Sequence, residues 1–131
     1  MQIVVLGGEP LLNDDYINYL FDILSKLTEN DATKFNNGII IQTNGIYTGA
    51  GNVETLKNRL FELYNINPDV IIAIETSIKG TNQKEVTLLA RSHPSLFQYN
   101  INSYYKLCEI NAPNLRPTVI AGFGFTTDKH F

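Results

Sequence analysis

Short runs of aliphatic residues recur along the chain, and each run leads into a polar stretch and then an amphipathic segment. The runs predict four strands, at residues 3–6, 39–41, 70–74 and 118–123. The first run contains no polar residue, which is typical of a strand buried on both faces in a parallel sheet covered by helices. The alternation of strands with helices favours βαβ crossovers and therefore an α/β fold.

Apolar residues at helical spacing fill the segments between these strands and predict helices. Asn13 and Asn52 are suitable N-caps for the first two helices, which should end near Asn30 and before Pro68. Residues 47–52, just before the second helix, contain two glycines and are expected to form a mobile loop.

Two further helices are predicted between the third and fourth strands. One has capping-box spacing and covers residues 82–91. The next places four residues on one face: Phe97, Ile101, Tyr104 and Cys108. Three tyrosines of this helix, at positions 99, 104 and 105, are also spaced like a packing face. Cys108 is the only cysteine, and its apolar neighbours favour a buried structural side chain over a metal ligand.

Composition indicates a globular chain and excludes several function classes. With 131 residues, 44% hydrophobic and 18% charged, residues 1–131 are expected to be one domain or part of one. A formal net charge of -3 gives no basic field for nucleic acid. No apolar run is long enough to span a membrane, and no leader precedes the first strand, so a cytoplasmic location is expected. The single cysteine excludes an internal disulfide and a cysteine-only metal site.

Polar groups follow three of the predicted strands at the point where each strand ends. They are Gly7, Gly8, Glu9 and Pro10 after the first strand, Thr43 and Asn44 after the second, and Glu75, Ser77 and Lys79 after the third. The carboxyl ends of parallel strands meet at one rim, where α/β proteins place ligand sites. Carboxylates accept hydrogen bonds from an ammonium group, a lysine pairs with a carboxylate, and hydroxyls and amides bond ribose hydroxyls. The mixture suits a small zwitterion that carries hydroxyl groups.

Each of these features also has a purely structural interpretation. A Gly-Gly turn after a strand is more often a matter of backbone geometry, and Thr-Asn-Gly is a common turn. Glu75 and Lys79 could form an ordinary ion pair. The order of the motifs, each directly after its own aliphatic strand, is what favours a ligand site.

This order of motifs resembles that of the radical S-adenosylmethionine (radical SAM) superfamily. Residues 7–10 match letter for letter the family's Gly-Gly-Glu-Pro motif, which holds the amino group of the methionine half of SAM. Residues 43–45 match a Thr-Asn-Gly that often closes the family's third strand. Ser77 and Lys79 fall where glycyl-radical activating enzymes have Asp-x-Lys, with serine in place of aspartate.

The resemblance covers residues 3 to about 123 and implies a particular architecture. The chain would form part of a (β/α) barrel, with about four parallel strands, the family's second to fifth, and helices on the outer face. Gly8 and Glu9 would orient the ammonium group of SAM, Ser77 and Lys79 would hold its ribose and carboxylate, and Asn44 would support the rim.

The cluster motif of the family is missing from this chain. Family members hold a [4Fe–4S] cluster with Cys-x-x-x-Cys-x-x-Cys, and Cys108 does not stand in for that motif. The resemblance therefore implies a fragment of an enzyme that cleaves SAM reductively to a 5′-deoxyadenosyl radical. This piece would contribute part of the SAM site and would bind no cluster and have no catalytic activity by itself. Its substrate is not indicated.

Two other interpretations remain open. One is a cluster-free α/β module that binds a nucleotide or another small anion, with the glycine turn feeding a helix N-terminus. The other is a non-enzymatic scaffold that keeps the fold without the site. In a fragment of this kind the first strand would lack its neighbour, and its exposed edge invites a homodimer or another strand-edge association.

Overall fold

The computed structural model describes residues 3–5, 8–30, 38–78 and 96–121. The strands are β1 (Ile3–Val5), β2 (Ile39–Thr43), β3 (Ile72–Ile78) and β4 (Leu115–Ala121). The helices are α1 (Asp14–Asn30), α2 (Ile46–Gly49), α3 (Glu54–Ile66) and α5 (Leu96–Ile110). Predictions for Gly7, Lys79 and a helix over 82–91 lie outside the described residues.

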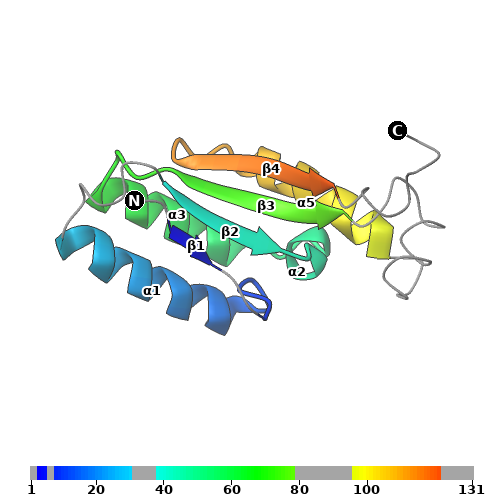
Figure 1. Cartoon of the computed structure of the whole chain (residues 1–131), viewed down its shortest axis with the longest axis horizontal. Coiled ribbons are helices and arrows are strands. Elements are labelled where there is room, and N and C mark those ends of the chain that lie inside the picture. Colours follow the sequence, from blue (N-terminus) through cyan, green and yellow to red (C-terminus); the bar gives the residue numbers. More distant parts are fainter. Residues whose placement is uncertain (1–2, 6–7, 31–37, 79–95, 122–131) are drawn as a thin grey trace.

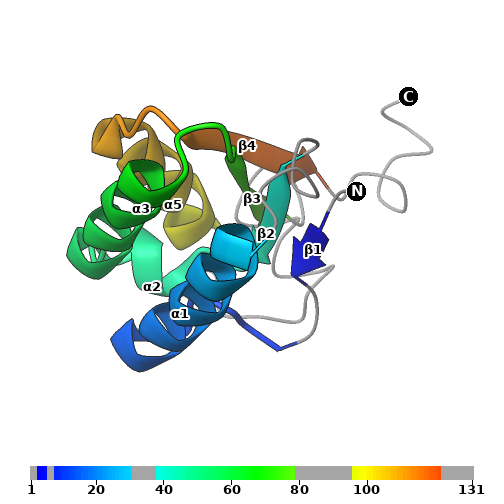
Figure 2. The same cartoon turned by 90° about the vertical axis from the view of Figure 1, so that its left-hand side faces the viewer.

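The four strands form one parallel sheet in the order β1-β2-β3-β4. The helices of the described chain lie on one side of this sheet, as Figures 1 and 2 show. Sequential strand order with helices on a single face is the arrangement of a β/α barrel, whereas doubly wound sheets carry helices on both faces. The predicted α/β fold, a parallel-stranded partial barrel with helices on its outer face, is confirmed.

The hydrophobic core lies between the sheet and this helical layer. Along β2 and β3 the alternate residues that face the helices are buried, while those on the other face are only half-buried. The helices contribute Ile17, Phe21, Leu24, Leu56, Leu60, Leu63 and Leu107 to the core. Burial of each such side chain stabilises the fold by about 1.5–3 kcal/mol.

Burial of β1 on both faces was predicted, and this prediction is wrong. Val4, at the middle of β1, is 41% exposed because the described helices cover only the opposite face of the sheet. In a partial barrel, that uncovered face corresponds to the inner wall.

The first two long helices differ in how their N-termini are capped. The Asn13 side chain accepts a hydrogen bond from the Tyr16 N–H at 2.9 Å, so the predicted N-cap and the end of α1 at Asn30 are confirmed. The predicted N-cap of α3 is wrong, because Val53 occupies that position and makes no side-chain cap bond. The Asn52 amide instead donates to the Tyr47 carbonyl at 3.2 Å.

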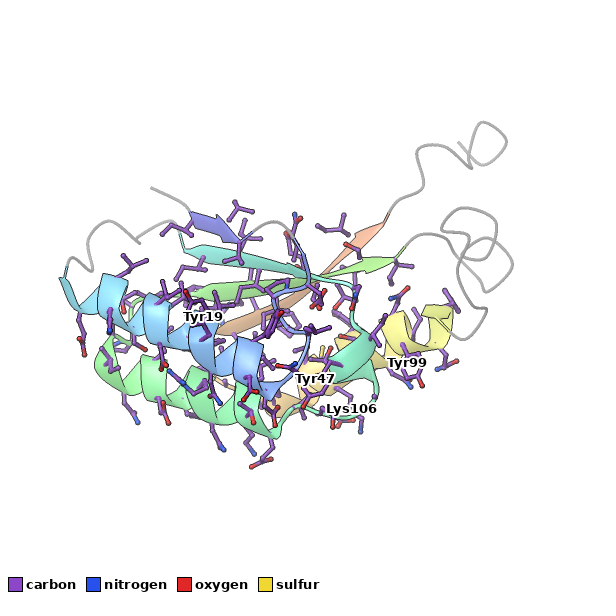
Figure 3. All side chains as sticks on the ribbon, turned by 90° about the horizontal axis from the view of Figure 1, so that it is seen from below. Tyr19, Tyr47, Tyr99 and Lys106 are labelled. Carbon is purple, nitrogen blue, oxygen red and sulfur yellow. The ribbon has the colours of Figure 1, made fainter. Side chains whose placement is uncertain are left out.

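The predicted loop at residues 47–52 is partly helical, because α2 covers Ile46–Gly49. Gly49 permits this helix to pack directly against α5, since a Cβ at this position would run into the Tyr99 carbonyl. Figure 3 labels Tyr47 on α2 and Tyr99 on α5, the neighbouring helix.

The predicted packing face of α5 is wrong. Among the α5 residues whose burial the structure describes, those buried are Asn100, Ser103, Leu107 and Ile110, at helical spacing. Cys108 follows Leu107 by one position, about 100° around the helix, and is exposed. Tyr105 is 62% exposed, and Tyr99 is exposed as well. Two polar side chains displace the expected aromatic face because both have hydrogen-bond partners in the interior.

In the described part of the chain, no helix has both the length and the apolar content needed to cross a membrane.

Candidate functional site

The carboxyl ends of β1 and β2 lie side by side, and the first two sequence motifs meet there. Glu9 follows β1, and Thr43 and Asn44 close β2 and lead into α2. We refer to Glu9, Thr43, Asn44 and Gly45 together as the rim cluster.

The Glu9 carboxylate ties these two strand ends together. Its Oε2 accepts hydrogen bonds from the Thr43 hydroxyl at 2.6 Å and from the Leu11 N–H at 2.9 Å. Its Oε1 accepts one from the Asn44 N–H at 2.7 Å. A carboxylate offers about four acceptor positions, and the described residues fill three of them, so that among these residues one position on Oε1 has no donor. Because Glu9 is only half-buried, that position is accessible to a ligand.

Gly8 gives a ligand access to the backbone beside Glu9. Its φ of 57° lies in the left-handed region that favours glycine. A Cβ at this position would meet no atom within 4 Å, so the space above the backbone is open. Gly8 is exposed, and Pro10, which fixes the chain direction after Glu9, is half-buried.

The Thr-Asn-Gly turn is fixed by its own side chains. The Gly45 N–H donates to the Thr43 hydroxyl at 3.1 Å, and the Ile46 N–H donates to Asn44 Oδ1 at 2.9 Å. Thr43 is 3% exposed, and its hydroxyl both donates to Glu9 and accepts from Gly45, so it acts on the cluster rather than on a ligand.

Gly45 is required by close packing as well as by its backbone. Its φ is 75°, and a Cβ there would lie 2.8 Å from the Ser103 Cβ and 2.9 Å from a methyl group of Thr76. The turn is therefore pressed against α5 and β3 with no room for a side chain.

Two residues of α5 belong to this site and were missed in the sequence. Asn100 Nδ2 donates to the Asn44 carbonyl at 2.5 Å, and the Ser103 hydroxyl lies 2.5 Å from that of Thr48 and 3.3 Å from that of Thr76. The available signal was the 3-4-3 spacing of Asn100, Ser103, Leu107 and Ile110, which a search restricted to apolar residues overlooks.

Glu75 and Ser77 form a second group on the opposite face of the sheet from Thr43. Both are half-buried and alternate with Thr76, which is buried under the helices. Glu75 Oε1 accepts a hydrogen bond from Gln42 Nε2 at 3.3 Å, across the β2–β3 ladder. Glu75 and Ser77 therefore face the inner wall of the partial barrel, while Glu9 lies at its edge. Among the described residues no hydrogen bond joins Glu75 or Ser77 to the rim cluster.

A tyrosine of α2, the helix that follows the Thr-Asn-Gly turn, connects α2 to α1. The Tyr47 hydroxyl of α2 donates to Asp14 Oδ1 at 2.8 Å, which ties α2 to the first turn of α1. This hydrogen bond, with burial and the negative charge of Asp14, raises the pKa of the Tyr47 phenol, because deprotonation would place two negative charges together.

The residues present do not fit an iron–sulfur cluster. A [4Fe–4S] cluster is held by cysteine thiolates, and this chain has one cysteine, exposed on α5. Among the described residues there is no group of three or more His, Cys, Asp or Glu side chains that could hold a metal ion.

Comparison with known proteins gives the chain no relative: no protein-family model, no curated protein and no solved structure matches it. The candidate site therefore depends on its own geometry.

One cavity of about 520 Å³ lies beside the rim cluster, and another of the same volume lies at the opposite, amino-terminal end of the strands. The first is lined by Pro10 and by α1 side chains that include Tyr16, Tyr19 and Ile23. The other lies where α5 leads into β4 and is lined by residues that include Cys108 and Arg116. Neither cavity is lined by a residue of the rim cluster, so the cluster could contact only one end of a ligand.

Proposed function

We propose that this chain is part of a radical SAM enzyme and that its rim cluster holds the methionine end of SAM. One observation carries the proposal: Glu9 of the Gly-Gly-Glu-Pro motif is hydrogen-bonded to Thr43 and Asn44 of the Thr-Asn-Gly motif. Thr43 and Asn44 follow Glu9 by 34 and 35 residues in the sequence, and the two motifs meet at the carboxyl edge of a parallel sheet. This contact supports a shared site rather than two unrelated turns.

Each residue has a role that follows from its chemistry. The remaining acceptor position on Glu9 Oε1 would take a hydrogen from the ligand's ammonium group, beside the open backbone of Gly8. Thr43 and Asn44 would keep that carboxylate oriented. Glu75 and Ser77, on the inner wall, would bond ribose hydroxyls, and Lys79 would pair with the ligand's carboxylate.

SAM supplies the reactive sulfonium, and the residues of this chain would bind and orient it. The cluster of the radical SAM family does not fit the donor set of this chain, so its ligands would belong to sequence outside these 131 residues. Anaerobic reconstitution followed by iron and sulfide analysis should find no stoichiometric cluster. Four irons per chain would overturn this part of the proposal.

Calorimetric titration of the chain with SAM tests the proposed function. We expect a dissociation constant at or below about 1 mM, corresponding to about −4 kcal/mol, and no measurable binding of inorganic phosphate. The variant Glu9→Ala should lose the binding, whereas Glu29→Ala, an exposed glutamate of α1, should retain it. Preferential binding of phosphate would instead favour a cluster-free anion-binding module, and binding of neither would favour a scaffold.

Location and partners are part of the same proposal. A cytoplasmic, reducing compartment would suit oxygen-sensitive chemistry of this kind. Self-association through the free edge of β1 remains a prediction, and β1 pairs only with β2 in the described sheet. Light scattering that finds a monomer at high concentration would contradict it.

A further inference from the structure

We propose that Asn100 and Ser103 of α5 are positioning residues that set the placement of the rim cluster without touching a ligand. The inference rests on the proposed function where it concerns SAM binding. Asn100 is 2% exposed and Ser103 is 0% exposed, so neither side chain can reach a ligand at the rim. Each acts through the residue to which it is hydrogen-bonded.

Asn44 is held from both sides. Its N–H donates to Glu9 Oε1 at 2.7 Å, and its carbonyl accepts from Asn100 Nδ2 at 2.5 Å. The two groups belong to the two peptide planes that flank Asn44, which are joined only through its φ and ψ rotations, so holding the carbonyl limits the directions open to the N–H. Asn100 therefore fixes the direction in which the Asn44 N–H points, and through it the position of the Glu9 carboxylate.

Ser103 holds the same turn from beneath. Its hydroxyl bonds to Thr48 of α2 and Thr76 of β3, and its Cβ allows no side chain on Gly45. Through these contacts a single residue sets the spacing between α2, β3 and the turn.

The burial of these polar groups is costly, which argues that their placement is specific. A buried polar atom without a partner destabilises a fold, and Asn100 Oδ1 has no hydrogen-bond partner in the described structure. An apolar residue would fill this position on α5 without that cost. The hydrogen bond from Asn100 Nδ2 to the Asn44 carbonyl explains why an asparagine occupies this buried position.

Hydrogen exchange of the Asn44 N–H in the full chain tests the positioning directly, without a ligand. The variant Asn100→Asp keeps the shape of the side chain and removes its donor. We expect exchange at Asn44 to become about tenfold faster, while the Lys57 N–H, bonded to the Val53 carbonyl within α3, keeps its rate. The matched control is Asn102→Asp on the same helix, whose Oδ1 accepts from Gln98 at the surface, and it should change neither rate.

Two outcomes of this experiment would overturn the positioning role. One is an unchanged Asn44 rate, and the other is an equal acceleration at Asn44 and Lys57, which would show general destabilisation. If Asn100→Asp does not fold, Ser103→Ala, which removes one hydroxyl, is judged by the same criteria.

Calorimetry with SAM then tests the link to binding. Asn100→Asp should bind SAM about tenfold more weakly than the unmodified chain, and Asn102→Asp should bind it equally well. A changed Asn44 exchange rate with an unchanged dissociation constant would overturn the link to binding. If the unmodified chain does not bind SAM, the proposed function fails, and the exchange measurement still decides whether Asn100 positions the turn.

Discussion

The carboxylate of Glu9 accepts a hydrogen bond from the backbone N–H of Asn44, 35 residues later in the chain, at 2.7 Å. A single side chain thus connects the ends of two neighbouring parallel strands. The carboxylate also accepts hydrogen bonds from the Thr43 hydroxyl and the Leu11 N–H, so three of its acceptor positions are filled. The remaining position is what makes this edge of the sheet a candidate for binding an ammonium group.

Removal of the Glu9 carboxylate should destabilise the fold as well as the site. Glu9→Ala leaves the Thr43 hydroxyl and two backbone N–H groups without their acceptor, at a cost of about 1–3 kcal/mol. Urea denaturation should show a lower midpoint with an unchanged slope. The exposed Glu29→Ala should stay within about 0.5 kcal/mol of the unmodified chain. Equal stability of the two variants would mean that Glu9 does not join the strand ends.

Alanine substitutions at Gly45 and Gly51 distinguish the effect of backbone strain on stability from the effect of close packing. Both have positive φ, but a Cβ at Gly45 would meet Ser103 at 2.8 Å, whereas one at Gly51 would meet nothing within 4 Å. Gly45→Ala should therefore lower the free energy of unfolding by about 1–3 kcal/mol more than Gly51→Ala. Thermal denaturation of both variants measures the difference. Similar losses would show that the turn is not pressed against α5.

Stability should depend on pH through Tyr47. Its hydrogen bond to Asp14 raises the pKa of the phenol, so the folded chain holds this proton more tightly than the unfolded chain. The stabilisation is therefore fully present below about pH 10 and is lost as the pH rises through the raised pKa. An NMR titration of the Tyr47 ring carbon should show a lower midpoint in Asp14→Asn. An unchanged midpoint would contradict the pairing.

Cys108 should behave as a surface thiol. It is exposed on α5, so a thiol reagent should label it fully in the native chain without denaturant. Cys108→Ser should change the free energy of unfolding by less than about 0.5 kcal/mol. Labelling that begins only after unfolding would restore the buried position predicted from the sequence.

The sequence predicts the number and order of the four strands because each contains aliphatic residues and is separated from the next by a helix. The bounds are less accurate: β3 extends to Ile78 and β4 begins at Leu115, because both strands include polar residues. It also locates the first two rim motifs, since both follow directly from where those strands end. It cannot show that Glu9 and Thr43 are hydrogen-bonded, because that contact depends on which strands are neighbours.

The face of α5 could not be predicted from apolar spacing for a related reason. Asn100 and Ser103 are buried against their hydrogen-bond partners, Asn44 and Thr48. These partners lie 56 and 55 residues away in sequence, so the local spacing of residues does not reveal them. The helix α2 escaped prediction because Gly49, which reads as a loop residue, is needed for contact with α5. Tertiary partners overrule local propensity at these positions.

An amide-shift titration of the ¹⁵N-labelled chain with SAM determines whether the rim cluster is where SAM binds. We expect the largest shifts at Gly8, Glu9, Asn44 and Gly45, and we expect Glu9→Ala to abolish them. The absence of shifts at millimolar SAM, or shifts confined to the cavity beside Cys108 and Arg116, would contradict this expectation.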